Sequence, residues 1–340
     1  MKKNIYVVRH GLSTFNKAGR MQGSSDESVL TDIGRSAALD AGAALKGIRF
    51  DRVIASPLAR ARQTCELIMS INQAGSAPPE FDIELRETNM YGWEGQSMVK
   101  LRDTCPEQWH NWHNDPAAMV LEHNGRAVYP LRDLYSRAEK FVRDNLESGR
   151  EENILLVSHG GTNQALINSA LGLDVTHHQT FQQSNCCISQ LSLDMQSGSY
   201  KLVQLNNTAP LGEKLPKLKA RKEGVRVVFV HHDDERGSHC GSRIVEELEL
   251  KSSRIRDLES ESADLAGEIR LLSEDRENLH NLVVLHSANR LEDIIRLCFK
   301  LPAALTRNEI FRKGHVTVVH HSQSHPKPII QCINQPLSAS

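Results

Sequence analysis

The sequence has no uninterrupted apolar run near the ~18 residues that a membrane-spanning helix requires. The basic start, Met1-Lys2-Lys3, precedes only a short apolar run, which Arg9 and His10 interrupt too early for the core of a secretory signal peptide. The ordinary signals for membrane insertion and secretion are therefore missing. We expect a cytoplasmic protein that does not associate with membranes.

A net charge is also missing, because 41 Lys and Arg residues balance 42 Asp and Glu residues. Without a strong field of one sign, the chain has no general attraction for nucleic acid or for an anionic membrane, so a small-molecule partner is the default. The seven cysteines are odd in number and irregularly spaced, which argues against a disulfide framework and favours a reducing compartment. They form no metal-ligand pattern, and we expect neither a metal nor a cofactor.

What the sequence does contain is an alternation of strand and helix patterns across 340 residues, a length that suits two domains. Apolar, β-prone runs end at Arg9, Ala55 and Ser158, and a helix-like stretch follows each of them. Such alternation predicts an α/β fold with a mainly parallel sheet and helices on both of its faces. Two further strand-like runs, 186–193 and 200–205, complete the unit.

Local signals place several boundaries of helices and strands. Thr31 is the expected N-cap of an Ala-rich helix, and Ser56 is the expected N-cap of a second helix with proline at its first position. The run Ile83–Leu85 is interpreted as a short strand, whereas residues 96–130 have no assignable pattern. Helical periodicity returns over residues 131–146.

The first predicted strand brings Arg9, His10 and Gly11 to its carboxyl end, which is where open α/β sheets bind ligands. Because neutral imidazole has a free nitrogen at neutral pH, His10 is a candidate nucleophile, and a phosphohistidine would divide a displacement at phosphorus into two easier steps. Phosphoryl transfer also needs cations or oriented N–H groups around three oxygens, and an acid for the leaving oxygen.

Candidate donors to phosphate oxygens occur at this strand end and at two others. Arg9 and Arg60 carry forked guanidinium donors, which match phosphate geometry. His159 follows a later strand, where Gly160 and Gly161 would let the backbone approach an anion at a helix N-terminus. These residues therefore predict a phosphate pocket.

Glu87 is the candidate acid, which would protonate the leaving alkoxide and later activate water, while Ser13 and Asn16 would add neutral donors. Each signal alone has a simpler explanation. A strand-end histidine is usually structural, a single glutamate after a strand is usually solvated, and a Gly-Gly pair is usually a turn. Their joint occurrence at successive carboxyl ends of α/β units favours a phosphoryl-transfer site.

The motifs of residues 1–206, taken in order, form a specific set. They are Arg9-His10-Gly11 with Ser13 and Asn16, Ser56-Pro57-Leu58-Ala59-Arg60-Ala61 with Gln63-Thr64, Leu85-Arg86-Glu87, Trp93-Glu94-Gly95 and Ser158-His159-Gly160-Gly161. This set resembles the histidine phosphatase (phosphoglycerate mutase-like) superfamily. The resemblance implies a phosphohistidine at His10 and Glu87 as the proton donor. The phosphate-binding set that we expect is Arg9, Ser13, Asn16, Gln22, Gly23, Arg60, His159 and Gly160.

Two further features narrow the resemblance. The tandem layout and the stretch Gln183-Ser184-Asn185-Cys186 are similar to cyanobacterial two-domain phosphatases and to plant 2-carboxyarabinitol 1-phosphate phosphatases. Trp93-Glu94-Gly95 resembles the phosphatase branch more than the mutases. The resemblance implies a phosphomonoesterase for a small anionic metabolite, such as the sugar-acid phosphate 2-carboxyarabinitol 1-phosphate, or phosphoserine.

Two alternatives stay open, namely a phosphoglycerate mutase and a non-catalytic phospholigand-binding regulatory module. The enzyme's specificity would depend on residues outside the motifs. Candidates to meet a substrate carboxylate, each of which is otherwise a solvated charge, are Arg20, Lys100, Arg102 and Arg126.

The chain contains an internal repeat. Residues 226–233 repeat the layout of residues 4–11 and place His232 opposite His10, and residues 281–286 repeat residues 154–159. We therefore expect a catalytic histidine phosphatase domain at 1–206, a linker at 207–224, and a truncated, degenerate α/β copy of the first domain at 225–340.

The second copy lacks the residues that phosphoryl transfer needs. His231 and Asp233 replace Arg9 and Gly11, and Ser287-Ala288 replaces Gly160-Gly161. The shortened middle contains no counterpart of Arg60 or Glu87. Because a carboxylate facing a phosphate adds repulsion where cations are gone, we expect this copy to be catalytically silent.

Two other patterns occur in the second copy. Leu258, Leu265, Leu272 and Leu279 recur every seven residues, which leaves open a coiled coil and a homodimer through the second domain. An amphipathic helix packed on its own domain is the simpler interpretation. Its histidines lack ligand spacing, so we expect strand-end polar residues rather than metal ligands at His315, His320, His321 and His325.

Overall fold

A computed structural model describes most of the chain, namely residues 2–72, 74–218, 223–231, 237–251, 253–257, 264–275, 277–286, 312–322 and 327–337. The chain divides into two compact units. Unit 1 comprises residues 1–179 and 183–201, and unit 2 comprises residues 180–182 and 202–340. Within the described ranges, no helix combines the length and the apolar character needed to cross a membrane.

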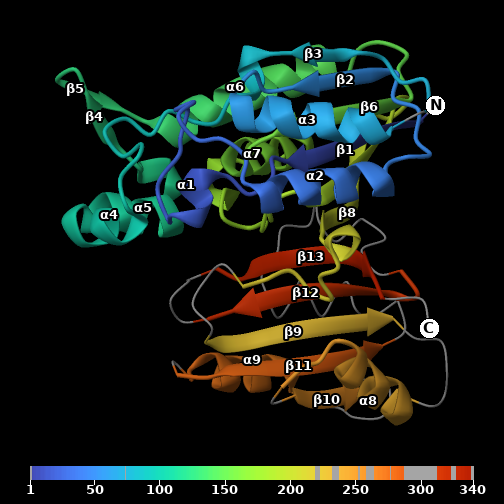
Figure 1. Ribbon diagram of the computed structural model, residues 1–340. Coiled ribbons are helices and arrows are strands. Elements are labelled where there is room, and N and C mark those ends of the chain that lie inside the picture. Colours follow the sequence, from blue (N-terminus) through green and yellow to red (C-terminus); the bar gives the residue numbers. More distant parts are fainter. Residues whose placement is uncertain are drawn as a thin grey trace. The chain divides into compact units, whose positions relative to one another are not determined.

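The sheet of unit 1 has the strand order β7-β1-β6-β2-β3 (Figure 1). Strands β1, β6, β2 and β3 are parallel, and β7 runs antiparallel to β1. The mainly parallel sheet predicted from the sequence is thus confirmed. The strands are β1 (Lys2–Arg9), β2 (Arg52–Ala55), β3 (Pro79–Phe81), β6 (Asn153–Ser158) and β7 (Ile188–Asp194).

Two pairs of helices cover this sheet (Figure 1). Helix α2 (Asp32–Ala44) packs on α3 (Ala59–Ile71), and α6 (Pro130–Asn145) packs on α7 (Gly160–Ala170). Successive residues of β6 are buried although their side chains alternate between the two faces, as expected for a sheet with helices on both faces. The remaining elements of unit 1 are α1 (Thr14–Lys17), η1 (Ile83–Leu85), α4 (Met98–Thr104), α5 (Pro106–Asn114), η2 (Pro116–Ala118), β4 (Leu121–His123), β5 (Arg126–Val128) and η3 (Val175–His177).

The start of α2 packs closely against the turn after β1. The hydroxyl of Thr31 accepts a hydrogen bond from the N–H of Gly34 at 3.1 Å, which confirms the predicted N-cap. A Cβ on Gly34 would lie 2.2 Å from the carbonyl oxygen of Leu12, so only glycine permits this approach. The helix therefore holds the segment that follows His10.

Three local predictions differ from the structure. Helix α3 begins at Ala59 with Leu58 as its N-cap, two residues after the predicted Ser56. The hydroxyl oxygen of Ser56 accepts from the N–H of Leu58 at 3.3 Å and also contacts His159. The run Ile83–Leu85 is a 3₁₀ helix, and the edge strand is β3. Residues 96–130, which had no assignable pattern, contain α4, α5 and the β4–β5 hairpin.

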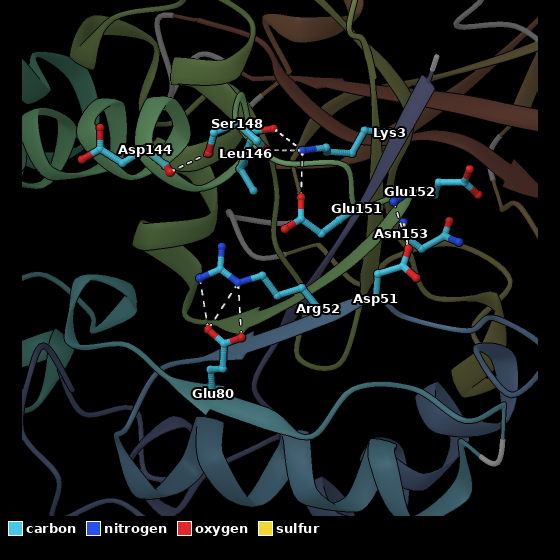
Figure 2. Close-up of polar contacts among 10 residues, drawn as sticks. All are labelled: Lys3, Asp51, Arg52, Glu80, Asp144, Leu146, Ser148, Glu151, Glu152 and Asn153. Carbon is cyan, nitrogen blue, oxygen red and sulfur yellow. Dashed lines mark hydrogen bonds and ion pairs between the residues drawn. The ribbon is translucent and has the colours of Figure 1, made fainter.

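A buried lysine ties the first strand to the end of α6 (Figure 2). The ammonium of Lys3 is fully buried and donates to the carbonyl oxygens of Leu146 at 3.0 Å and Ser148 at 2.6 Å. It also pairs with Glu151 at 3.4 Å. Because Leu146 is the C-cap of α6, the lysine satisfies a carbonyl that the helix leaves without an internal partner.

The sheet of unit 2 repeats the layout of unit 1. Strands β10, β11 and β9 are parallel, and β12 lies antiparallel between β9 and β13. In unit 1, β2, β6 and β1 are likewise parallel, followed by antiparallel β7. The elements are β9 (Gly224–His231), α8 (Gly237–Glu247), β10 (Ser253–Asp257), α9 (Leu265–Ser273), β11 (Leu279–His286), β12 (His315–His321), β13 (Ile329–Pro336), η4 (Ala209–Leu211) and the part of β8 (Ser199–Asn207) from Leu202 onward.

The strand registers correct the alignment of the two copies. In unit 1 Arg9 pairs with Ser158, and in unit 2 His231 pairs with His286. If His231 corresponds to Arg9, the register makes His286 the counterpart of Ser158 and not of His159. The alignment of residues 281–286 with 154–159 was therefore wrong by one residue. Of the other compared positions, His232, Asp233, Ser287 and Ala288 lie outside the described residues.

The heptad leucines of the second copy do not form a coiled coil in the part that is described. Helix α9 ends at Ser273, and Leu279 begins strand β11. Leu265, Ile269 and Leu272 are buried, so an amphipathic helix packed on its own unit is the correct interpretation. Leu258 lies outside the described residues, and the homodimer stays a prediction.

Histidines of unit 2 bind backbone carbonyls. His320 Nε2 lies 2.8 Å from the carbonyl oxygen of Glu223, and His315 Nδ1 lies 2.9 Å from that of Lys313. His325 lies outside the described residues. Over the described ranges, no group of three or more His, Cys, Asp or Glu residues is arranged to hold a metal ion.

The predicted linker belongs to unit 2, and its described residues bind other parts of that unit. The side-chain amide of Gln335 donates to the carbonyl oxygens of Glu213 at 3.1 Å and Lys214 at 2.7 Å. Lys214 also pairs with Glu249 at 2.6 Å. The described residues of this segment are thus attached to the unit that follows them.

Candidate active site

His10 lies just after β1 and is 2% exposed. Its Nδ1 lies 2.8 Å from the carbonyl oxygen of Gly11. Because a carbonyl can only accept, Nδ1 carries the hydrogen in the neutral ring and Nε2 carries the lone pair. The ring is therefore oriented to use Nε2 as a nucleophile.

Three elements hold the backbone of this turn. The N–H of His10 donates to the carbonyl oxygen of Ser158 at 2.8 Å, and the N–H of Gly11 donates to the hydroxyl of Thr64 in α3 at 3.0 Å. A Cβ on Gly11 would lie 2.5 Å from the carbonyl oxygen of Gly34. A glycine at position 11 is therefore required by the approach of α2.

His159 follows β6 and is fully buried, with its ring centroid 5.2 Å from that of His10. Its Nε2 lies 2.8 Å from the hydroxyl oxygen of Ser56. Burial, together with the positive charges of Arg60 and Arg9 and the nearby His10, lowers the pKa of His159 well below 6.5. The ring is therefore neutral at neutral pH.

Two arginines lie beside these rings, the partly buried Arg9 and the fully buried Arg60. Arg9 donates from Nη1 to the carbonyl oxygen of Gln183 at 2.8 Å. Arg60 is fully buried and donates to the carbonyl oxygens of Ser25 at 2.7 Å and Gly23 at 2.8 Å. Burial lowers the pKa of Arg60 to about 10 and lowers that of Arg9, so both guanidinium groups stay charged at neutral pH.

Three nitrogen atoms of this cluster, two on arginines and one on a histidine ring, are buried without a hydrogen-bond partner within the described ranges. They are Nε of Arg9, Nε of Arg60 and Nδ1 of His159. Buried polar groups are normally hydrogen-bonded, and cations held together repel one another. A multiply charged anion with several acceptor oxygens, such as a phosphoryl group, matches both features.

Glu87 is not part of α7, but its carboxylate lies at the N-terminus of that helix. Its carboxylate accepts hydrogen bonds from the N–H groups of Gly161 at 3.0 Å, Thr162 at 3.1 Å and Thr88 at 3.0 Å. The N-terminus of α7, which was expected to approach phosphate through Gly160 and Gly161, thus gives two of its N–H groups to this side chain. The helix end therefore fixes the predicted acid.

The Gly-Gly pair makes room for two side chains of the candidate site. A Cβ on Gly161 would lie 2.7 Å from Oε1 of Glu87, and one on Gly160 would lie 3.3 Å from Nε of Arg9. Neither glycine has a positive φ. The two glycines are therefore explained by the close approach of Glu87 and Arg9, rather than by a turn conformation.

The remaining predicted donors surround α1. Ser13 caps this helix, and its hydroxyl donates to Oε1 of Gln22 at 2.7 Å. Its only hydroxyl hydrogen is therefore already used. Oδ1 of Asn16 accepts from Asn185 Nδ2 at 3.1 Å. Gly23, the last of the predicted set in this loop, contributes the carbonyl that binds Arg60.

Two supporting residues were missed at the sequence level. Arg137 of α6 donates to the carbonyl oxygens of Glu84 at 3.0 Å and Arg86 at 2.8 Å, and so holds the segment before Glu87. Its position in a charged amphipathic helix gave no signal of this role. Glu94, known only as part of a motif, accepts from the N–H of Ser24 at 2.8 Å and fixes the loop that binds Arg60.

The candidate carboxylate-binding residues are dispersed. Arg20 lies over the ring of Phe15 at 6.0 Å, and Arg102 pairs with Asp103 at 3.0 Å. Lys100 is exposed on α4, and Arg126 is exposed on β5. The geometry selects none of the four as a substrate ligand.

The constellation of a strand-end histidine, two arginines, a second histidine and a glutamate can be compared with known proteins. The family model described as the histidine phosphatase superfamily (branch 1) matches residues 5–208. This chain belongs to the histidine phosphatase superfamily. The family assignment from the sequence motifs is thereby confirmed.

The curated relatives of this chain are named for two different activities, a phosphatase and a mutase. The 2-carboxy-D-arabinitol-1-phosphatase of Triticum aestivum is 33% identical over 244 residues, which are 71% of this chain and 48% of the relative. The chain thus spans about half the length of that plant protein. An Escherichia coli protein named "Probable phosphoglycerate mutase GpmB" is 32% identical over 190 residues, which are 55% of this chain and 83% of the relative.

Among solved structures, the mycobacterial glucosyl-3-phosphoglycerate phosphatase is similar with a TM-score of 0.53 and 26% identity, covering 60% of this chain and 98% of that one. This similarity confirms the phosphoglycerate mutase-like fold.

Proposed function

We propose that this chain is a phosphomonoesterase that acts through a phosphohistidine at His10. The observation that carries the proposal is the oriented Nε2 of His10 beside three buried nitrogen atoms without hydrogen-bond partners in the described part of the chain, which belong to Arg9, Arg60 and His159. The names of the plant and mycobacterial relatives support hydrolysis.

In the first step, Nε2 of His10 attacks phosphorus as the bond to the ester oxygen breaks. The guanidinium groups of Arg9 and Arg60 and the ring of His159 bind the three remaining oxygens. Glu87 in its acid form gives a proton to the leaving alkoxide, which departs as an alcohol. The nitrogen–phosphorus bond formed replaces the oxygen–phosphorus bond lost.

In the second step, the Glu87 carboxylate takes a proton from a water molecule, and the water oxygen attacks phosphorus. The nitrogen–phosphorus bond breaks, its electron pair returns to Nε2 of His10, and inorganic phosphate leaves. The helix N–H groups at Gly161 and Thr162 hold Glu87 in place through both proton transfers.

Ser56 sets the tautomer of His159. The Ser56 hydroxyl oxygen accepts from the N–H of Leu58 at 3.3 Å, and we propose that its hydrogen is donated to Nε2 of His159 at 2.8 Å. The hydrogen of the neutral ring then lies on Nδ1, the atom without a protein partner. His159 therefore donates to a phosphoryl oxygen without having to be protonated.

For the substrate we propose a small anionic phosphomonoester, with 2-carboxyarabinitol 1-phosphate as the first candidate because the Triticum and Arabidopsis relatives are named for it. Phosphoserine is the second candidate. Phosphate release should be measured across a panel of phosphorylated metabolites and ranked by kcat/KM. A flat ranking, with no sugar-acid phosphate above a generic ester, would contradict this substrate class.

The mutase alternative is favoured by the name of the Escherichia coli relative. Incubation with 3-phosphoglycerate, with and without its bisphosphate, distinguishes the two activities. The proposal predicts free phosphate without isomerised product. Isomerisation without phosphate release would identify a mutase.

Unit 2 is proposed to be catalytically silent, and His232→Ala in the full chain is expected to leave kcat/KM unchanged. If the full chain bound a phosphorylated metabolite without hydrolysing it, and His232→Ala abolished that binding, unit 2 would be the working part, as the non-catalytic regulatory-module alternative requires.

A further inference from the structure

A loop of unit 1 wraps around the turn that presents the nucleophile. The N–H of Cys186 donates to the carbonyl oxygen of Arg9 at 3.0 Å. The side-chain amide of Asn185 donates from Nδ2 to the carbonyl oxygen of His10 at 3.0 Å and to that of Gly11 at 3.3 Å. The second of these carbonyls is the one that orients the His10 ring.

The orientation of Asn185 follows from its partners. Backbone carbonyls only accept, so the NH₂ group of Asn185, and not its oxygen, faces His10 and Gly11. The same NH₂ group lies 3.1 Å from Oδ1 of Asn16. One of its hydrogens is shared by the two carbonyls, and the other is donated to Asn16.

This donation also fixes Asn16. Its Oδ1 accepts from Asn185 and, at 3.5 Å, from the N–H of Ser13. With the oxygen held by two donors, the NH₂ group of Asn16 is turned away from both of them. An asparagine held in this way can offer only donors to a neighbouring ligand, which suits a phosphoryl oxygen.

We propose that Asn185 is a positioning residue, which orients the His10 ring through the carbonyl of Gly11 and presents the amide N–H groups of Asn16 to the phosphoryl group. The proposal rests on the proposed function, because it assigns the nucleophile to His10. The bonds to Arg9 from the N–H of Cys186 and the carbonyl of Gln183 come from the backbone and do not depend on the Asn185 side chain.

The isosteric variant Asn185→Asp tests the proposal. The substitution replaces the NH₂ group with an oxygen that faces three acceptor oxygens. This oxygen repels the carbonyls of His10 and Gly11. The amide of Asn16 must then turn its NH₂ group towards residue 185 and away from the phosphoryl group. The expected result is a loss of roughly a hundredfold in kcat/KM for p-nitrophenyl phosphate, because a donor to several oxygens is replaced by an anion. Gln196→Glu, the matched change in the exposed turn after β7, should leave kcat/KM unchanged.

A double-mutant cycle separates positioning from general stabilisation. Asn185→Ala should lower kcat/KM about tenfold in the wild-type background and clearly less in an Asn16→Ala background, because part of its effect passes through Asn16. Additive losses would overturn the proposal. So would an Asn185→Asp enzyme within threefold of wild type. If Asn185→Asp fails to fold by thermal unfolding, the cycle with Asn185→Ala decides.

His10→Ala in the same assays distinguishes this inference from the function on which it rests. An inactive His10→Ala with a fully active Asn185→Asp overturns only the positioning role. A fully active His10→Ala overturns the proposed function itself.

Discussion

The rings of His10 and His159 lie 5.2 Å apart, centroid to centroid, and both are buried at the ends of adjacent parallel strands. Each ring is oriented by a different partner, a backbone carbonyl for His10 and a serine hydroxyl for His159. The first leaves a lone pair on Nε2 of His10, and the second, when the serine donates as we propose, leaves a hydrogen on Nδ1 of His159. One ring can therefore attack phosphorus while the other binds its oxygen.

The tautomer of His159 is tested by Ser56→Ala. Without the hydroxyl, the hydrogen of His159 is no longer held on Nδ1, so we expect kcat/KM to fall about tenfold with little change in stability. Steady-state kinetics on p-nitrophenyl phosphate measures the effect. Ser70→Ala removes a hydroxyl that binds only the carbonyl of Leu67 on the exposed side of α3, and it serves as the control. Equal activity of both variants would contradict the role of Ser56.

The spacing around Glu87 is tested by Gly161→Ala. The added methyl group would meet Oε1 of Glu87 at 2.7 Å, so the carboxylate must move, and we expect kcat to fall by roughly tenfold to a hundredfold. Gly47→Ala is the control, because a Cβ there meets no atom within 4 Å. A Gly161→Ala enzyme with wild-type kcat would show that Glu87 does not need this position.

Because the ammonium of Lys3 is buried, removing its contacts should destabilise the protein more than removing a more exposed ion pair. Figure 2 shows both sets of contacts. Lys3→Ala leaves the carbonyl of Leu146 without its donor and should cost about 2 kcal/mol of unfolding free energy. Arg52→Ala breaks a more exposed pair with Glu80, 3.1 Å long, and should cost about 0.5 kcal/mol. Urea unfolding of both variants gives the comparison. An equal cost would contradict the importance of burial.

The buried ring of His178 predicts a dependence of stability on pH. Burial lowers its pKa to about 4, whereas an unfolded chain protonates this histidine near pH 6.5. The unfolded state therefore binds more protons between these values, and stability falls as the pH drops from 6.5 towards 4. At pH 5 the loss amounts to about 2 kcal/mol relative to pH 7.

His178→Gln removes this titration, and the difference in unfolding free energy between pH 7 and pH 5 should shrink by that amount. Comparing the same variant at two pH values cancels the packing cost of the substitution. An unchanged difference would mean that His178 does not stay neutral in the fold.

Much of the fold and of the candidate site could be predicted because both depend on local patterns. Short apolar runs ending in His10 and Ser158 place two turns at the same sheet edge, since parallel strands begin and end together. The site residues that the sequence motifs predicted lie together at this edge of the sheet.

The rest depends on contacts between distant residues. Ser56 has the sequence pattern of an N-cap, and only the arrival of His159 from β6 gives its hydroxyl another partner. In the stretch without a periodic pattern, Trp109 packs against Trp93 and Trp112, with ring centroids 6.3 Å and 5.3 Å away. Such aromatic packing follows no fixed spacing. Asn185 was noted only as part of a resemblance motif, and its role gave no local signal because its acceptors, which belong to His10, Gly11 and Asn16, lie near the start of the sequence.

The most direct test of the central claim is to trap the covalent intermediate. The enzyme is mixed with an excess of radiolabelled phosphomonoester, quenched in alkali and digested, and the labelled peptide is identified by mass spectrometry. The account predicts an acid-labile phosphate on His10, which is absent from His10→Ala, and no hydrolysis by that variant. Labelling at another residue, or hydrolysis by His10→Ala at the wild-type rate, would contradict it.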